Sequence, residues 1–145
     1  MIRRIAAVAL ASLALAACGS VSASTALSRW TSSSNLTGSL AQLTLDARHA
    51  VSALRTATTS AAQLHTVCAV LDFETLQANA SLPSPDAQAT ALLSSAYTDL
   101  GSGANECYKA AASKAQRNIA VNYLIRAGAE ISEAQARVAS VTARS

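Results

Sequence analysis

Cysteine is the residue type with the widest chemistry in this sequence, because its thiol can be acylated, can pair as a disulfide or can bind a metal ion. Cys18 is the first of three cysteines, and the segment before it has three distinct parts. Residues 1–4 carry two arginines, residues 5–14 are apolar, and residues 15–17 end in small side chains. This order is typical of a secretory signal peptide, and the apolar run is too short to span a bilayer. We therefore expect residues 1–17 to be a signal peptide that directs export.

The four residues Leu15-Ala16-Ala17-Cys18 resemble the lipobox of bacterial lipoproteins. The resemblance implies that a lipid with acyl chains such as palmitate is attached to the Cys18 thiol and that the chain is cleaved before Cys18. The lipid would then hold the protein on the extracytoplasmic face of the cell membrane, with about 0.8 kcal/mol contributed by each buried methylene. The alternatives are a secretory signal with an incidental cysteine and an uncut membrane helix, which would need about 20 apolar residues.

His49 and His65 are the next candidates for chemistry, because imidazoles on two facing helices could begin a metal site. The signal is weak, since neither histidine belongs to a Glu-x-x-His or His-x-x-x-His pair. No serine lies in a Gly-x-Ser-x-Gly or Ser-x-x-Lys motif, and the sequence has no glycine-rich phosphate loop after a strand. We therefore expect no enzyme and no cofactor, and we expect the two histidines to be solvated or to lie at the rim of the core.

The formal charge of +3 comes mainly from the N-terminal segment. Without Arg3 and Arg4, nine Lys and Arg remain against eight Asp and Glu. A chain with so balanced a charge is a poor binder of phosphate backbones, so we expect no nucleic-acid partner. Cleavage before Cys18 leaves 128 of the 145 residues, which is enough for one small domain.

Residues 18–34 differ in composition from the rest of the chain. Nine of the fifteen residues from Ser20 to Ser34 are Ser or Thr, without apolar periodicity. This composition predicts a disordered, flexible tether between Cys18 and a domain over residues 35–145. Trp30 is the one bulky side chain in the tether, and we expect it to pack on the end of the domain; contact with the membrane interface or with a partner is the alternative.

From Leu36 onward the apolar residues recur at alternating steps of four and three, which is the period of one helix face. Four such stripes predict an all-α domain, an antiparallel up-down-up-down four-helix bundle with short connections. The four stripes consist of Leu36, Leu40, Leu43, Ala47, Ala50 and Leu54; Ala61, Leu64, Cys68, Leu71 and Leu76; Ala89, Leu93, Ala96, Leu100, Cys107 and Ala110; and Ala120, Leu124, Ala127, Ile131, Ala134, Val138 and Val141.

Helix-breaking and capping residues separate the stripes. A Thr-rich cluster ends at Ser60, and both Ser60 and Ser113 precede a Gln by three residues, as in a capping box. The alternative to the first break is one unbroken helix over 36–79. Ser84 and Pro85 are suited to the cap and the first position of the third helix.

Cys68 and Cys107 lie on the core stripes of neighbouring helices. If Cys18 carries lipid, these two remain in a compartment where disulfides persist, so we expect them to pair and to stabilise the fold by roughly 4 kcal/mol. Two buried free thiols are the alternative. Helix rise places Cys68 about 18 Å before the end of its helix and Cys107 about 33 Å beyond the start of the next. Pairing therefore requires an extended run over 79–84 or a kink at 101–103.

Three short motifs, Leu64–Cys68, Leu82–Asp86 and Cys107-Tyr108, look like those of small helical lipoproteins of high-GC Gram-positive bacteria. The resemblance covers most of the chain after Cys18. It implies the helical fold and the disulfide, but it implies no activity.

The sequence therefore predicts a non-enzymatic envelope lipoprotein that binds an unknown envelope protein or polymer. The alternative is a small-ligand or metal carrier that uses the bundle interior or the His49/His65 face. A polar-lined cavity between the helices would favour the carrier, whereas a packed interior with an exposed apolar patch would favour partner binding. A lipoprotein encoded by a phage to block later infection is a variant of the first hypothesis.

Overall fold

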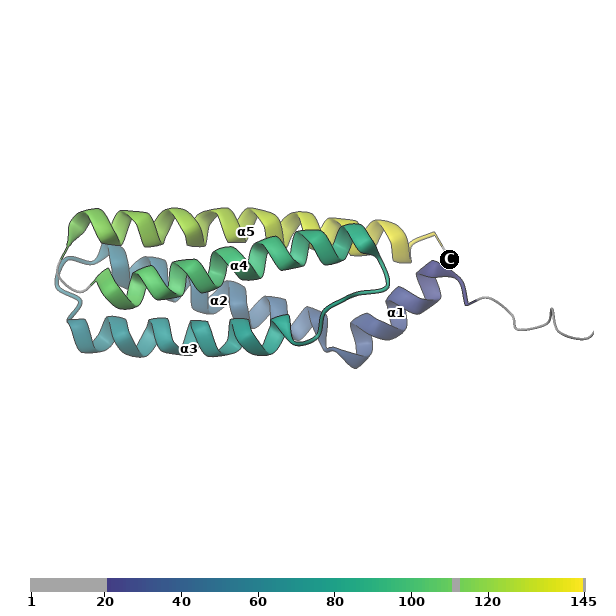
Figure 1. The fold of residues 1–145 in the computed structure, drawn as a ribbon, viewed down its shortest axis with the longest axis horizontal. Coiled ribbons are helices and arrows are strands. Elements are labelled where there is room, and N and C mark those ends of the chain that lie inside the picture. The colour runs from purple at the N-terminus through teal and green to yellow at the C-terminus, as the bar shows by residue number, and fades with distance from the viewer. Residues whose placement is uncertain (1–20, 111–112, 145) are drawn as a thin grey trace, which may run out of the picture.

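The computed structural model describes residues 21–110 and 113–144 (Figure 1). The described residues form helices and connections without any strand, which confirms the all-α class. The expected signal peptide over 1–17 and the expected lipid site, Cys18, lie outside the described residues. The part of the chain that the structure describes contains five helices, α1 (Ala23–Ser33), α2 (Leu36–Arg55), α3 (Ala61–Asn79), α4 (Ala87–Lys109) and α5 (Lys114–Thr142).

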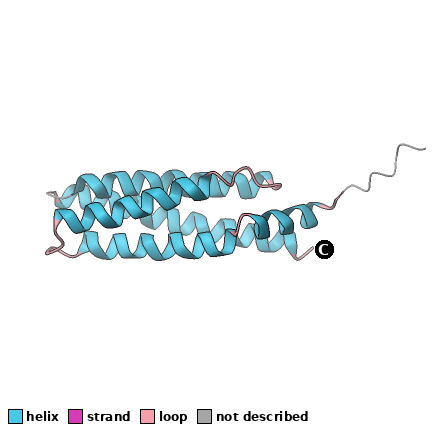
Figure 2. Ribbon diagram, turned by 90° about the horizontal axis from the view of Figure 1, so that it is seen from below, coloured by secondary structure: helices cyan, strands magenta, loops and turns pink. Residues whose placement is uncertain are grey.

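Helices α2 to α5 lie alongside one another, whereas the short α1 extends from one end of the molecule (Figures 1 and 2). Helix α4 contacts α3 and α5, and α2 also contacts α3 and α5, so each long helix has two principal neighbours. The result is an elongated, bundle-like arrangement. Its core runs along the axis between the four helices.

The apolar stripes on α2, α4 and α5 face this core. Every member of the first and third stripes is buried, as are all but Val138 of the fourth. The second stripe is wrong at both ends, because Ala61 and Leu76 are exposed. Thr75 is buried in place of Leu76, and its hydroxyl donates to the carbonyl oxygen of Leu71 at 2.7 Å. Steps of three and four from Leu64 lead to residue 75 and not to 76. The helix period therefore places Thr75 in the core and leaves the apolar Leu76 exposed.

The ends of the helices follow local hydrogen bonding. The Ser60/Gln63 capping box is present, and the chain leaves the helical conformation between α2 and α3, so the single helix over 36–79 is wrong. At Ser113 only half of the expected box forms. The Ser113 hydroxyl accepts from the Gln116 backbone N–H, but the Gln116 side chain donates to Glu106 instead.

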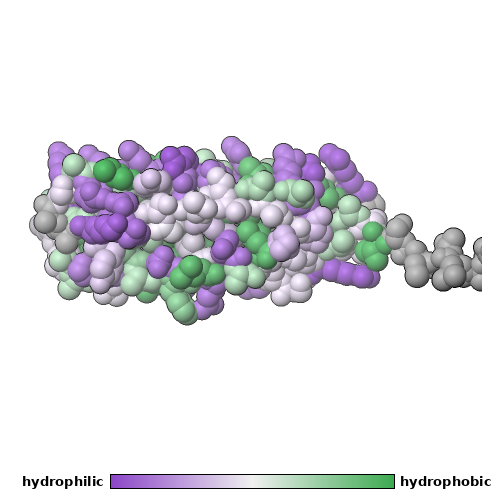
Figure 3. Space-filling model, in the orientation of Figure 1, coloured by the Kyte–Doolittle hydropathy of each residue, from purple (hydrophilic) through white to green (hydrophobic). Residues whose placement is uncertain are grey.

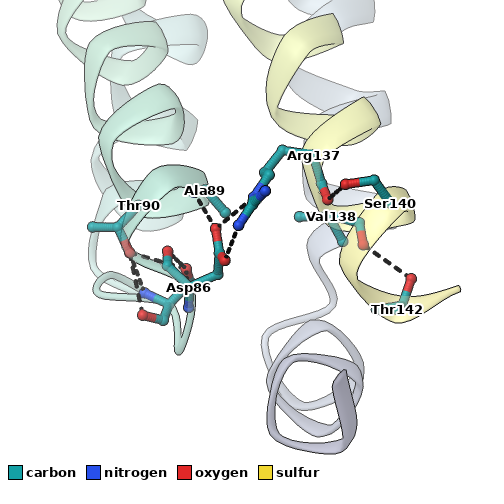
Figure 4. Close-up of polar contacts among 8 residues, drawn as sticks. Asp86, Ala89, Thr90, Arg137, Val138, Ser140 and Thr142 are labelled. Atoms are coloured by element: carbon teal, nitrogen blue, oxygen red, sulfur yellow. Dashed lines mark hydrogen bonds and ion pairs between the residues drawn. The ribbon is translucent and has the colours of Figure 1, made fainter. Parts of the chain in front are cut away.

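Helix α4 begins two residues later than the sequence predicts. Asp86, not Ser84, is the N-cap, and its carboxylate accepts from the Ala89 N–H at 2.7 Å. Proline has no N–H, and Ser84 instead bonds to the Thr90 hydroxyl at 2.9 Å. The Asp86 carboxylate also accepts from two nitrogens of Arg137 on α5, at 3.0 and 2.7 Å (Figure 4). The start of α4 is thereby tied to the last turns of α5.

Residues 80–86 form the long connection between α3 and α4. It runs past the end of α3 before the chain turns back into α4 (Figure 1). At 1.5 Å per residue, Cys68 lies about 16 Å before the end of α3 and Cys107 about 30 Å beyond the start of α4. The connection covers the difference of about 14 Å, within the reach of seven extended residues. Helix α4 continues through 101–103, so the extended run, and not a shortened helix, brings the cysteines level.

The tether prediction is wrong over α1. Ser22 caps this helix, and its apolar positions three residues apart point inward: Leu27 is fully buried, and the Trp30 indole N–H donates to the Ser81 carbonyl oxygen at 3.1 Å. Several hydroxyls donate to backbone carbonyls one turn earlier, such as Thr31 to Ser28 at 2.8 Å. Within a helix, Ser and Thr hydroxyls can form their hydrogen bonds with nearby backbone carbonyls. A Ser-rich segment can therefore be helical when apolar side chains such as Leu27 and Trp30 pack it against the domain. Trp30 packs against the domain, as expected.

Candidate binding surfaces

Cys68 and Cys107 are brought to disulfide distance. Their Cα atoms are 5.8 Å apart, and the two sulfur atoms are bonded across the contact between α3 and α4. Both residues are almost fully buried. The pair therefore has a structural position, away from solvent and from the clefts described below.

The two histidines that could begin a metal site are used differently. The His65 ring stacks on Tyr108, with centroids 4.1 Å apart and planes 13° apart. His49 is exposed on α2. In residues 21–110 and 113–144, no group of three or more His, Cys, Asp or Glu side chains lies close enough to hold a metal ion. The histidines thus take part in no metal cluster in that part of the chain.

Three arginines on α5 serve the fold. Arg117 donates to the carbonyl oxygens of Leu54, Thr56 and Thr59 and so caps the end of α2, at distances of 3.4, 3.0 and 3.3 Å. Arg126 pairs with Asp99 on α4, and Arg137 pairs with Asp86. The Arg137 guanidinium, together with the Ala89 N–H, lowers the pKa of Asp86 to about 2. All three guanidinium groups therefore have hydrogen-bond or ion-pair partners within the molecule.

A groove lies at the surface between α2 and α5, and we call it the α2/α5 groove. Its volume is about 1120 Å³. Its lining includes the apolar or small side chains of Ala41, Leu45, Ile125 and Gly128, of which Leu45 and Ile125 are about half exposed. A Cβ atom added at Gly128 would meet nothing within 4 Å, so the backbone of α5 is open to an approaching group there.

Of the side chains that the structure describes, the only charged ones that line the groove are those of Arg48 and Arg55 on α2. They are seven residues apart and therefore lie on one side of the helix. Among the described residues neither makes an ion pair or a side-chain hydrogen bond, in contrast to the three arginines of α5. The groove is therefore both apolar and positively charged.

The outward face of α3 carries a second apolar stripe, which we call the outer seam. Phe73 and Leu76 are 61% and 62% exposed, and Val70 beside them is 45% exposed. Hydrophobic surface is visible over the middle of α3 in Figure 3. The seam follows the four-three spacing of a coiled-coil face on the side opposite the core. Its members are Ala62, Thr66, Ala69, Phe73 and Leu76.

Acidic residues flank the outer seam. Helical geometry places Asp72 on one side and Glu74 on the other, and α3 contains no Lys or Arg. Glu74 lies beside Asp46 of α2, whose carboxylate accepts from the Gln42 side chain at 2.9 Å. Partial burial, and then the negative charge of Asp46, raises the pKa of Glu74. The seam thus combines apolar area with negative charge.

The sequence prediction missed both surfaces. A signal for the seam was present, because α3 has apolar residues on two opposite faces whereas a helix with one buried side has them on one. The groove had no comparable signal, because its shape depends on how α2 and α5 pack against each other.

Comparison with known proteins adds no relative: no family model, no curated protein and no solved structure matches this chain. In the described residues, no helix is long and apolar enough to cross a membrane.

Proposed function

We propose that this chain is a lipid-anchored envelope lipoprotein, attached to the extracytoplasmic face of the cell membrane through Cys18, and that it acts as a non-enzymatic binding module. In this proposal the module is an antiparallel up-down-up-down four-helix bundle of α2 to α5, with α1 packed at one end. Its partner is a protein that covers exposed apolar surface.

One observation carries the binding role: apolar side chains are exposed over a filled interior. Leu40, Leu64, Leu71 and Leu93 are at most 1% exposed and fill the core between the helices. Large apolar side chains nevertheless remain outside, in the outer seam and in the α2/α5 groove. Contiguous exposed apolar surface of this kind is typical of a protein interface.

A small-ligand carrier is the second candidate, and the volume of the α2/α5 groove is the observation that favours it. A groove of about 1120 Å³ is as large as many ligand sites. Its open shape and its pair of arginines would suit an anionic ligand at the surface. The bundle interior suits a ligand less well, because leucine side chains and the disulfide fill it.

Membrane attachment can be tested by labelling cells with an alkyne-bearing fatty acid. We expect label in the wild-type chain and its recovery with membranes, and loss of the label in Cys18→Ser. The matched control is Cys68→Ser with Cys107→Ser, which should keep the label. Label that persists in Cys18→Ser would overturn the anchor.

The binding role can be tested with a photoreactive phenylalanine analogue at position 73, followed by irradiation of whole cells. We expect crosslinked protein adducts from this position. The control position is Ser94, an exposed residue on α4 outside the seam and the groove, and it should give none. Equal adducts from both positions, or none from either, would contradict the proposal.

A further inference from the structure

We propose that the partner is a second copy of this chain, and that the outer seam of one copy docks in the α2/α5 groove of the next. This inference rests on the proposed binding function and names its partner. The two surfaces are complementary, because the seam is a projecting helical face with acidic flanks and the groove is a concave surface with two arginines.

The apolar parts of the two surfaces match in form. The outer seam is a single helical face that projects Phe73 and Leu76, whereas the groove is a trough between two helices. Residues 41 to 56 line the α2 side of the groove over about 22 Å, and residues 62 to 76 of the seam extend over about 21 Å. A helix that lays apolar residues at this spacing into a groove is a recurrent mode of recognition. Gly128 gives such a helix room for close approach.

The charges of the two surfaces are opposite. Asp72 and Glu74 flank the seam, and Arg48 and Arg55 are the charged residues of the groove. Docking of seam on seam would instead bring the acidic flanks of two α3 helices together, and groove on groove would bring the arginines together. Charge complementarity therefore favours seam in groove and disfavours both symmetric pairings.

An interface between two different surfaces is heterologous, so each copy that joins leaves one seam and one groove free. Copies add head to tail, and the assembly grows unless the geometry closes it into a ring. The inference therefore predicts a directional contact that can be tested one side at a time.

The test uses two differently tagged full-length copies expressed together in a bacterial host that attaches lipid. The donor copy carries the photoreactive phenylalanine analogue at position 73, and the receiver copy is unlabelled. We expect a crosslink from donor position 73 to groove residues of the receiver, such as Leu45 or Ile125, mapped by mass spectrometry.

Blocking the groove gives the matched comparison. Gly128→Trp fills the groove, whereas Gly101→Trp adds the same side chain to α4 at a site where a Cβ also meets nothing within 4 Å and which does not line the groove. Gly128→Trp in the receiver should lower the crosslink yield at least about tenfold, which corresponds to a loss of about 1.4 kcal/mol. Gly101→Trp in the receiver, and Gly128→Trp in the donor alone, should leave the yield unchanged. Circular dichroism of each variant checks that the helices remain folded.

Charge reversal gives a second readout. Arg48→Glu with Arg55→Glu in the receiver should lower the yield about fivefold, the effect of two exposed ion pairs, and Asp72→Arg in the donor should recover part of it. A crosslink to α3 of the receiver, or one that is insensitive to Gly128→Trp, overturns the head-to-tail contact. Crosslinks only to a different envelope protein overturn self-association but leave the proposed binding function standing, and no crosslink to any protein overturns both.

Discussion

Helix α5 packs against α4 on one side and faces α2 on another, and the two contacts are built differently. Against α4 the helices approach closely at Gly103, where an added Cβ would lie 2.5 Å from Leu124 Cδ2. Toward α2, a Cβ atom added at Gly128 of α5 would meet nothing within 4 Å, whereas Gly103 belongs to α4. The difference shows that glycine serves two purposes here: it permits packing within the fold at one position and leaves room at the surface at the other.

The cations repeat this contrast. On the α4 side, Arg126 and Arg137 are paired with carboxylates that are mostly buried. On the α2 side, Arg48 and Arg55 line the groove without ion pairs in the described residues. Arg126 and Arg137 are neutralised by carboxylates of the fold itself, whereas the charges of Arg48 and Arg55 are available for the contact that we propose with a second copy. We therefore call the α3–α4–α5 contacts the closed side and the α2/α5 groove the open side.

The strongest challenge to the closed side is removal of the disulfide. Cys68→Ala with Cys107→Ala should lower the free energy of unfolding by about 4 kcal/mol, because the bond closes a loop across α3 and α4. Urea unfolding of the oxidised wild type and of the double variant measures the difference. Cys18→Ser is the control and should leave the urea midpoint in place. An unchanged midpoint in the double variant would show that the closed side does not depend on this bond.

The glycine contrast gives the next largest effect, and the sign reverses between the two sides. Gly103→Ala should destabilise the fold by about 1–3 kcal/mol, because its Cβ has no room beside Leu124 and Tyr123. Gly128→Ala and Gly101→Ala should instead stabilise it by up to about 1 kcal/mol, since alanine favours the helix and meets no neighbour. Thermal unfolding of the three variants tests the signs. Destabilisation by Gly128→Ala would contradict an open groove.

The Asp86–Arg137 pair on the closed side predicts a pH dependence. The folded pKa of Asp86 is lowered to about 2, so its stabilisation is complete above the ordinary value near 4 and is lost as the pH falls from about 4 to about 2. Asp86→Asn should remove this dependence and cost about 1 kcal/mol at neutral pH, allowing for screening of a partly exposed pair. Unfolding curves at several pH values measure both. A wild-type stability that stays level over this range would count against the pair.

Glu74 should show the smallest effect, with the opposite sign. Its folded pKa is raised, so the charged form is disfavoured in the fold, and stability should increase as the pH falls through that pKa. Glu74→Gln should therefore stabilise the chain slightly at neutral pH, and the gain should shrink in acid. Asp72→Gln on the other flank of the seam serves as the control. A gain that is the same at all pH values would rule out the carboxyl pair with Asp46.

The sequence was most informative where one physical rule acts alone. The stripe from Leu36 to Leu54 needs only helix period and burial, and the Ser60 cap needs only local hydrogen bonding, so both were predictable. The pairing of Cys68 with Cys107 was also predictable, because both lie on core stripes of neighbouring helices. The sequence left open whether an extended connection over 79–84 or a kink at 101–103 brings them level, and only the course of α4 decides this.

Prediction failed where distant contacts decide. Leu27 and Trp30 give α1 an apolar face, but the Ser-rich sequence around them does not indicate a helix. Contacts with α2, α5 and Ser81, which are distant in the sequence, stabilise this helix. The groove was not predictable for a similar reason, since its shape depends on how two helices distant in the sequence, α2 and α5, pack against each other. The sequence does not distinguish Arg48 and Arg55 from the paired arginines, because only the folded arrangement places Asp86 and Asp99 beside α5 and away from the groove.

The helical structure of α1 has a consequence for the proposed lipid anchor, because it would limit how far the domain can stand from a bilayer. If Cys18 carries lipid, the chain from Cys18 to the first helical residue, Ala23, can span at most about 17 Å. Helix α1 lies at the same end of the molecule as the C-terminus and contacts α5 (Figure 1). A lipid on Cys18 would thus hold that end close to the headgroups. Any contact made by the domain would then take place next to the membrane, where anchored copies would meet at a high local concentration.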